Sequence, residues 1–100
     1  MPTATPAATE QLVRSVLERL NADLPAADRF AISDDTVIMG DAGVLDSLGI
    51  ANFIVGMEEE VQRAFGVELA LSDQDLAGLF EQPQVTVQAF AAFVHQRAST

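Results

Sequence analysis

The chain of 100 residues contains no cysteine, no tryptophan and no tyrosine, and it has a single histidine. Without cysteine there is no disulfide, no thiolate metal site and no cysteine nucleophile, so any thiol chemistry has to come from a bound group. Lysine is also missing, since all five basic residues are arginine. We therefore expect no binding to nucleic acid or to anionic membrane surfaces.

Long apolar runs are missing too, although 49% of the residues are hydrophobic. No run approaches the roughly 20 residues of a membrane-spanning helix. The first residues, Met-Pro-Thr-Ala-Thr-Pro-Ala-Ala, have neither the basic nor the apolar region of a secretory signal, which leads us to expect a cytoplasmic protein. Residues 1–8 are expected to form a flexible tail, followed by one domain over residues 9–97 with a single core.

Negative charge is concentrated in the middle of the chain. Residues 34–81 hold eleven of the fifteen acidic residues and only one arginine, so this segment accounts for the net charge of −10. Its acids are Asp34, Asp35, Asp41, Asp46, Glu58, Glu59, Glu60, Glu68, Asp73, Asp75 and Glu81. Such a surface would steer basic partner surfaces toward it. An acidic surface also serves solubility alone, and both interpretations stay open.

Apolar residues recur at helical spacing in four segments, which predicts an all-α fold, a small four-helix bundle. The first helix follows the tail and is limited by Pro25, and the second runs from about Ser47 to Phe65 and stops at Gly66. The predicted inward residues are Leu12, Val13, Val16, Leu17 and Leu20 in the first helix, Ile50, Phe53, Ile54, Met57, Val61 and Ala64 in the second, and Val87, Phe90, Ala91 and Val94 in the last.

The remaining elements are less regular in sequence. Ser72 with Asp75 opens a short third helix, and Pro83 prevents its continuation. The apolar residues of this helix are Leu76, Leu79 and Phe80. Thr86 caps the last helix. Residues 25–46 form a long connection whose apolar residues indicate a loop laid over the core, and no strands are expected because no alternation of useful length occurs.

The most informative feature is the tetrad Asp46-Ser47-Leu48-Gly49 at the start of the second helix. If Asp46 is the N-cap, its carboxylate accepts from the free amides of Leu48 or Gly49. Ser47 then occupies the first helical position, beside unpaired amides and the positive end of the helix dipole, where phosphate groups bind. An isolated Asp-Ser pair is also an ordinary helix cap, so the pair alone does not define a modification site.

Two apolar residues fall on the outer side of this second helix. Leu48 and Val55 lie two turns apart and opposite the core stripe, where a solvated face would be polar throughout. Scattered exposed apolar residues are normal. Their alignment next to Ser47 favours a docking strip for a partner.

The stretch Gly43-Val44-Leu45-Asp46-Ser47-Leu48 resembles the modification motif of the phosphopantetheine-dependent carrier proteins, the acyl, peptidyl and aminoacyl carriers of thioester biosynthesis. Phe65-Gly66-Val67-Glu68-Leu69 and the closing amphipathic helix are similar to the family as well, so the resemblance extends from about Glu10 to Gln96. It implies a carrier domain over residues 9–97. The implied fold is a bundle of the acyl carrier protein type, with a long loop between its first two helices and a short third helix.

In this family the serine carries a covalent 4'-phosphopantetheine arm. The resemblance implies attachment at Ser47, with Asp46, Leu48 and Gly49 forming the surroundings of the site. A phosphopantetheinyl transferase would attach the arm from coenzyme A, and the protein would be a non-catalytic, monomeric carrier.

The resemblance also implies partner enzymes. An activating ligase or acyltransferase would load acyl or aminoacyl cargo as a thioester, and a downstream transferase, ketosynthase or condensation enzyme would unload it. Partners in this family dock largely on the helix that follows the serine. The docking positions would here be Leu48, Ala51, Val55, Glu58 and Glu59.

Two departures from the family pattern bear on the pathway. Carriers of the fatty-acid-synthase type usually have an acidic residue where Gly49 stands, and a glycine is more similar to the D-alanyl carrier protein and to stand-alone carriers of natural-product pathways. The segment from Phe65 to Gln84 is also longer, and Leu79-Phe80-Glu81-Gln82-Pro83 resembles peptidyl carriers. The sequence therefore favours polyketide or nonribosomal peptide biosynthesis over fatty-acid synthesis.

Two other functional classes stay open. One is an acidic adaptor of the same fold whose serine is never modified. The other is a small serine hydrolase, for which His95 is the one histidine, predicted near a helix end far in sequence from Ser47. Metal binding is not expected, because neither Asp34-Asp35 nor Asp73-Gln74-Asp75 has the ligand spacing of an EF-hand loop.

Overall fold

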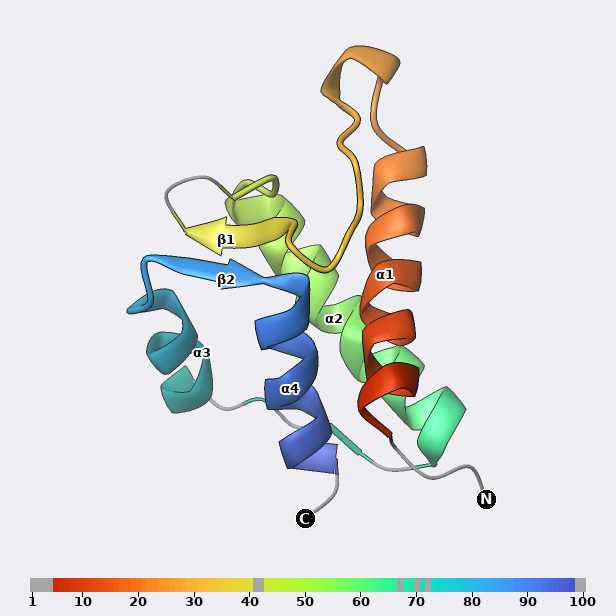
Figure 1. Cartoon of the computed structure of the whole chain (residues 1–100), viewed down its shortest axis with the longest axis vertical. Coiled ribbons are helices and arrows are strands. Elements are labelled where there is room, and N and C mark those ends of the chain that lie inside the picture. Colours follow the sequence, from red (N-terminus) through yellow and green to blue (C-terminus); the bar gives the residue numbers. More distant parts are fainter. Residues whose placement is uncertain (1–4, 41–42, 67, 70, 72, 99–100) are drawn as a thin grey trace.

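The computed structural model describes residues 5–40, 43–66, 68–69, 71 and 73–98. Its elements are α1 (Pro6–Ala22), the 3₁₀ turn η1 (Ala26–Asp28), β1 (Val37–Gly40), α2 (Ser47–Phe65), α3 (Asp73–Phe80), β2 (Gln84–Thr86) and α4 (Val87–Ala98). In Figure 1, α1 and α4 lie side by side in front of α2, while α3 lies at the edge of the molecule beside α4. The fold is a small helical bundle, as predicted, with a two-stranded sheet added to it.

The first helix begins earlier than the sequence predicted. The side chain of Thr5 accepts a hydrogen bond from the amide of Ala8 at 3.1 Å and so caps α1. Pro6 occupies the first helical position, where its missing N–H costs no hydrogen bond. Residues 6–8, predicted as part of a tail, are therefore helical, and residues 1–4 of that predicted tail lie outside the described residues.

The predicted bounds of α2 and the predicted start of α4 are confirmed. α2 ends at Gly66, which has a left-handed φ of 68° and donates its N–H to the carbonyl of Gln62 at 2.9 Å. The Thr86 hydroxyl accepts from the amide of Ala89 at 3.1 Å and caps α4. Ser72, the predicted opening residue of α3, lies outside the described residues.

One cluster of buried side chains joins the helices and the sheet. Every inward residue predicted for α4 is buried, as are Phe53, Ile54, Met57 and Val61 of α2, with Ile50 and Ala64 partly buried. The rings of Phe53 and Phe90 link α2 to α4, because their centroids lie 4.9 Å apart with planes tilted by 58°. In α3, Leu79 is buried but Phe80 is 54% exposed, since successive helical residues point about 100° apart.

The expectation of no strands is wrong. β1 and β2 pair antiparallel, with Val37 opposite Thr86 and Gly40 opposite Gln84, and the register shifts at a bulge after Val37. Strands of four and three residues carry too little alternation to be detected, and their pairing joins distant parts of the chain. Gly40 has a φ of 114°, and a Cβ there would lie 2.3 Å from the carbonyl oxygen of Pro83. Only glycine suits this approach of the two strands.

The long connection between α1 and α2 lies over the core, as predicted. Phe30 and Ile32 pack against the core, and Asn21 at the end of α1 fixes the backbone of Phe30 by two hydrogen bonds of 2.9 and 3.0 Å. Arg14 of α1 forms an ion pair with Asp34 in the connection. The hydrogen bond from Arg14 to this carboxylate raises the pKa of the arginine.

The same connection also binds the start of α4. The carbonyl of Thr36 accepts from the amide of Val87 at 2.9 Å, and the carbonyl of Asp34 accepts from the amide of Gln88 at 3.2 Å. These two amides have no partner within their own helix, so the connection supplies one for each. No helix in the described ranges combines the length and the apolarity needed to cross a membrane.

Candidate functional site

The candidate site is the first turn of α2. Asp46 is its N-cap: one carboxylate oxygen accepts from the amide of Gly49 at 2.8 Å, and the backbone carbonyl accepts from the amide of Ile50 at 2.8 Å. The predicted cap is confirmed, with Gly49 rather than Leu48 as the donor. Ser47 is the first residue of the helix and is exposed. Its hydroxyl is therefore accessible to a partner at the positive end of the helix.

A short segment, residues 43–45, leads into this turn, and we call it the strap. The amide of Val44 donates to the carbonyl of Val37 at 3.0 Å, and the amide of Leu45 donates to the carbonyl of Ile38 at 3.4 Å. Both acceptors belong to β1, so the strap is held against the sheet. In Figure 1, β1 lies between β2 and the start of α2. The sequence singled out the strap as part of the motif but gave no signal for its contacts, because the strand that it binds was not predicted.

Gly43 begins the strap at a place with no room for a side chain. A Cβ there would lie 2.7 Å from the Cα of Met39 and 2.9 Å from the carbonyl oxygen of Ile38. These neighbours are backbone atoms of β1, whose residues Ile38 and Met39 are buried in the core. The strand cannot yield as a flexible side chain would.

Gly49 stands in a more moderate contact with the cap. A Cβ at this position would lie 3.2 Å from the cap oxygen of Asp46 and 3.3 Å from the Cβ of Leu45. Both are tight but not impossible contacts, so a larger residue would push the cap by a few tenths of an ångström. Glycine lets the first turn of α2 fit closely under the strap.

The outer face of α2 has the exposure that its sequence predicts. Leu48 is 71% exposed and Val55 is 53% exposed. Ala51 and Glu59 are exposed as well, and Glu58 is partly buried. The five positions named as docking residues are thus at or near the surface of one helix that begins with Ser47.

The outer face of α2 is acidic, because the nearby ion pairs involve Glu60 rather than Glu58 or Glu59. Glu60 is turned toward α1, where its carboxylate lies 3.3 Å from both Arg19 and Arg63. Its side chain is only 13% exposed, whereas Glu59 lies on the outer face. Arg19 of α1 and Arg63 of α2 thus share the carboxylate of Glu60, and neither is paired with Glu58 or Glu59 in the described ion pairs.

Two shallow depressions border the outer face of α2. One runs between α1 and α2 and is lined by Val16, Arg19, Leu20, Asp23, Asn52, Val55, Gly56 and Glu59. The other lies near the end of α2 and is lined by Glu58, Glu59, Gln62, Glu68 and Leu69. Val55, Glu58 and Glu59 therefore stand on the rims of surface hollows rather than on a flat face.

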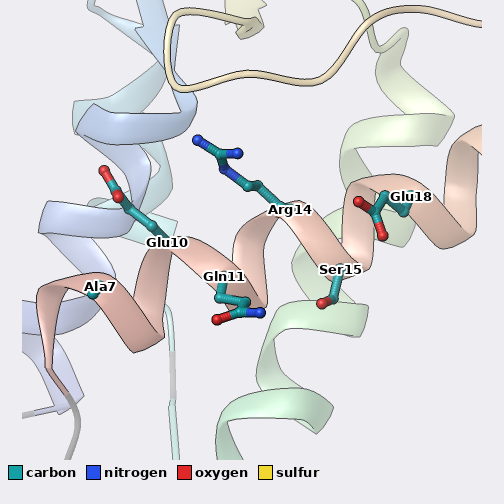
Figure 2. Close-up of a pocket in the computed structure, with 6 residues that line it drawn as sticks. All are labelled: Ala7, Glu10, Gln11, Arg14, Ser15 and Glu18. Atoms are coloured by element: carbon teal, nitrogen blue, oxygen red, sulfur yellow. The ribbon is translucent and has the colours of Figure 1, made fainter.

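A third depression follows α1 and contains none of the predicted site residues. Ala7, Glu10, Gln11, Arg14, Ser15 and Glu18 line it. Figure 2 shows all six on the same helix, with Arg14 directed toward the chain segment that crosses α1. Arg14 forms the ion pair with Asp34 described above. The depression is a polar helix face without convergent groups from other elements.

The structure does not bring Ser47 and His95 together as a hydrolase would need. Ser47 opens α2 beside β1, whereas His95 lies in the last turn of α4, at the opposite end of that helix from β2 (Figure 1). The Nδ1 atom of His95 is buried and has no hydrogen-bond partner among the described residues. A triad histidine instead holds a carboxylate with one ring nitrogen and the serine with the other. Within the described ranges, no three His, Asp or Glu side chains gather in a way that would hold a metal ion.

Comparison of the chain with protein-family models, with curated proteins and with solved structures found no match. The functional features of the chain are therefore the geometry of the first turn of α2 and the resemblance of its motif.

Proposed function

We propose that the protein is a carrier that holds acyl or aminoacyl intermediates on a 4'-phosphopantetheine arm attached to Ser47. The single observation that carries this proposal is the exposed serine at the first position of α2, capped by Asp46 and held by the strap. An ordinary helix cap needs only the Asp46 contact. It does not need a glycine-led strap before it and an exposed leucine after it.

The residues present fit a phosphodiester at this position. The first amides of a helix have no partner within the helix, and the helix dipole is positive there, so negative charge on the Ser47 oxygen is favoured. Leu48 is exposed beside it and offers an apolar surface to an enzyme that approaches the hydroxyl. When bound, the arm supplies the thiol that this cysteine-free chain lacks.

The chain's own part in attachment is to present the hydroxyl. The Ser47 oxygen would form a bond to the phosphorus that carries pantetheine in coenzyme A, the bond from that phosphorus to the adenosine-bisphosphate part would break, and the hydroxyl proton would pass to a base of the transferase. Asp46 is already engaged with Gly49 as a cap. Its role here is to fix the first turn rather than to take the proton.

The outer face of α2 supports docking of the enzymes that attach, load and unload the arm. Leu48 and Val55 provide exposed apolar area, and Glu58 and Glu59 provide negative charge beside it. Partners with a basic rim around an apolar recess would fit this combination. We propose a phosphopantetheinyl transferase, a ligase or acyltransferase, and a transferase, ketosynthase or condensation enzyme as these partners.

Gly49 favours a natural-product pathway over primary fatty-acid synthesis within this proposal. An acidic side chain at position 49 would begin with a Cβ 3.2 Å from the Asp46 carboxylate. A side chain there would crowd the cap oxygen, and glycine avoids this contact. Gly49, the third residue of α2, thus leaves the cap undisturbed, whereas the fatty-acid type usually has an acidic residue at this position.

The test is the intact mass of the protein after incubation with coenzyme A and a broad-specificity phosphopantetheinyl transferase. We expect the mass to rise by one arm in the wild type and to stay unchanged in Ser47→Ala, while Ser15→Ala, on the α1 face, is modified like the wild type. An unmodified wild type would contradict the carrier function and favour the adaptor alternative. Modification of Ser47→Ala would show that the site is wrong.

A further inference from the structure

We infer that the strap, residues 43–45, positions Ser47 for modification, and that Gly43 is the residue on which this positioning depends. The inference rests on the proposed function, since it concerns the presentation of Ser47 to a transferase. Gly43 would act by fixing the strap, without touching the transferase or the arm.

The strap is attached to the fold through β1. The strap amides of Val44 and Leu45 both donate to β1, and the amide of Gly43 donates to the carbonyl of Gly40 at 3.1 Å. The side chain of Leu45 packs against the core as a partly buried residue. The next residue, Asp46, is already the cap of α2, so the position of the strap sets where the helix begins.

β1 is a rigid support for the strap. Ile38 is fully buried and Met39 is 2% exposed. β1 is paired with β2, which continues directly into α4. A strap held by this strand is held by the core as a whole.

Only glycine at position 43 permits the close approach of the strap to β1. The nearest atoms to an added Cβ are the Cα of Met39 at 2.7 Å, the carbonyl oxygen of Ile38 at 2.9 Å and the carbonyl carbon of Met39 at 3.0 Å. Since β1 is fixed, a side chain at position 43 would lift the strap from the strand and lengthen the hydrogen bonds of Val44 and Leu45. The start of α2 would move while the helix itself stays formed.

Two other glycines provide matched controls for Gly43→Ala. At Gly78 in α3 an added Cβ would meet no atom within 4 Å, so Gly78→Ala changes composition without a clash. At Gly56 the added Cβ would lie 2.9 Å from a methyl group of Val16, where α1 crosses α2. Gly56→Ala therefore strains the contact of α1 with α2 at a place away from the strap, and hydrogen exchange of this variant separates such strain from an effect on the strap.

The experiment measures kcat and KM for transfer of the arm from coenzyme A at a temperature well below the Tm of every variant. We expect Gly43→Ala to lower kcat/KM by about 10- to 100-fold, because small displacements of a reacting group have effects of this size. Gly78→Ala should stay within about twofold of the wild type, as changes away from the site do. A folded Gly43→Ala variant with the kcat/KM of the wild type would overturn the inference.

Hydrogen exchange supplies a readout that does not depend on modification. In the wild type the amides of Val44 and Leu45 should be protected, and Gly43→Ala should lower their protection by about tenfold or more while the amides in the middle of α2 keep theirs. Gly56→Ala should leave the two strap amides protected. Unprotected strap amides in the wild type would overturn the inference even if Gly43→Ala failed to fold.

A second variant tests the strap by kinetics even if Gly43→Ala does not fold. Val44→Pro removes the N–H that donates to Val37 and adds no Cβ at position 43. The same loss of kcat/KM is expected, and an unchanged value would count against the strap. A wild type that gains no arm at all would contradict the proposed function instead, and the hydrogen-exchange result would still decide whether the strap is held.

Discussion

The two faces of α2 both carry apolar side chains, and they do so for different reasons. On the inner face Met57 is fully buried among residues from the other elements, whereas on the outer face Val55 is 53% exposed and stands beside Glu59. The inner residues contribute to the core that holds the helix in place. The outer residues contribute little to folding, and under the proposed function their apolar character serves docking. One helix thus serves as a structural element on its inner face and carries the proposed docking surface on its outer face.

The largest expected effect is the loss of stability from a substitution on the inner face of α2, compared with a substitution on its outer face. Met57→Ala removes buried volume and should lower the free energy of unfolding by about 2–5 kcal/mol. Val55→Asp lies on the exposed face and should change it by no more than about 0.5 kcal/mol. Urea unfolding followed by circular dichroism measures both. A large loss for Val55→Asp would place Val55 in the core and remove the distinction between the faces.

The next effect concerns the charge on the outer face. Changing Glu58 and Glu59 to lysine should slow association with the transferase by about tenfold at low ionic strength, and rising salt should reduce the difference. Helix formation should be unaffected, because glutamate and lysine have similar helix propensities. The measurement is the association rate of the double variant and the wild type over an ionic-strength series.

A matched variant separates local charge from net charge. Glu10→Lys combined with Glu18→Lys changes the net charge by the same amount on the α1 face shown in Figure 2. Its association rate should fall much less than that of the α2 variant. Equal slowing by both pairs would mean that only the overall charge matters, and then the outer face of α2 would have no special role.

The smallest of the expected effects is at the junction of the two faces, where Asp46 caps the helix. Asp46→Ala removes the acceptor for the Gly49 amide and should cost about 1 kcal/mol of stability. Asp46→Asn keeps a cap acceptor and should cost much less. Thermal unfolding of the three proteins checks this, and an equal loss for the two variants would indicate that the carboxylate charge, rather than the cap, is what stabilises the turn.

Much of this architecture could be predicted from the sequence, because it depends on local signals. The start of α2 at Ser47, its end at Gly66 and the cap at Thr86 follow from residues that act on their immediate neighbours. The inner stripe of α2 follows from helical periodicity. The exposure of Leu48 and Val55 follows from the same periodicity.

The sequence did not show what depends on contacts between distant segments. The pairing of β1 with β2 and the attachment of the strap to β1 involve backbone atoms, which leave no pattern of side chains. The requirement for glycine at position 43 comes from the backbone of Met39, which lies against it, and the sequence does not show this contact. The early start of α1 at Pro6 was missed because proline and alanine in a short segment are also typical of a tail.

Attachment at Ser47 is tested by locating the arm within the modified wild-type protein. After transfer from coenzyme A, proteolysis and fragment-ion mass spectrometry assign the added mass to one residue. We expect the whole of the added mass on Ser47, with none on Ser15 or Ser33. A protein that gains no mass, or that carries the arm on any serine other than Ser47, would contradict the proposed carrier function at Ser47.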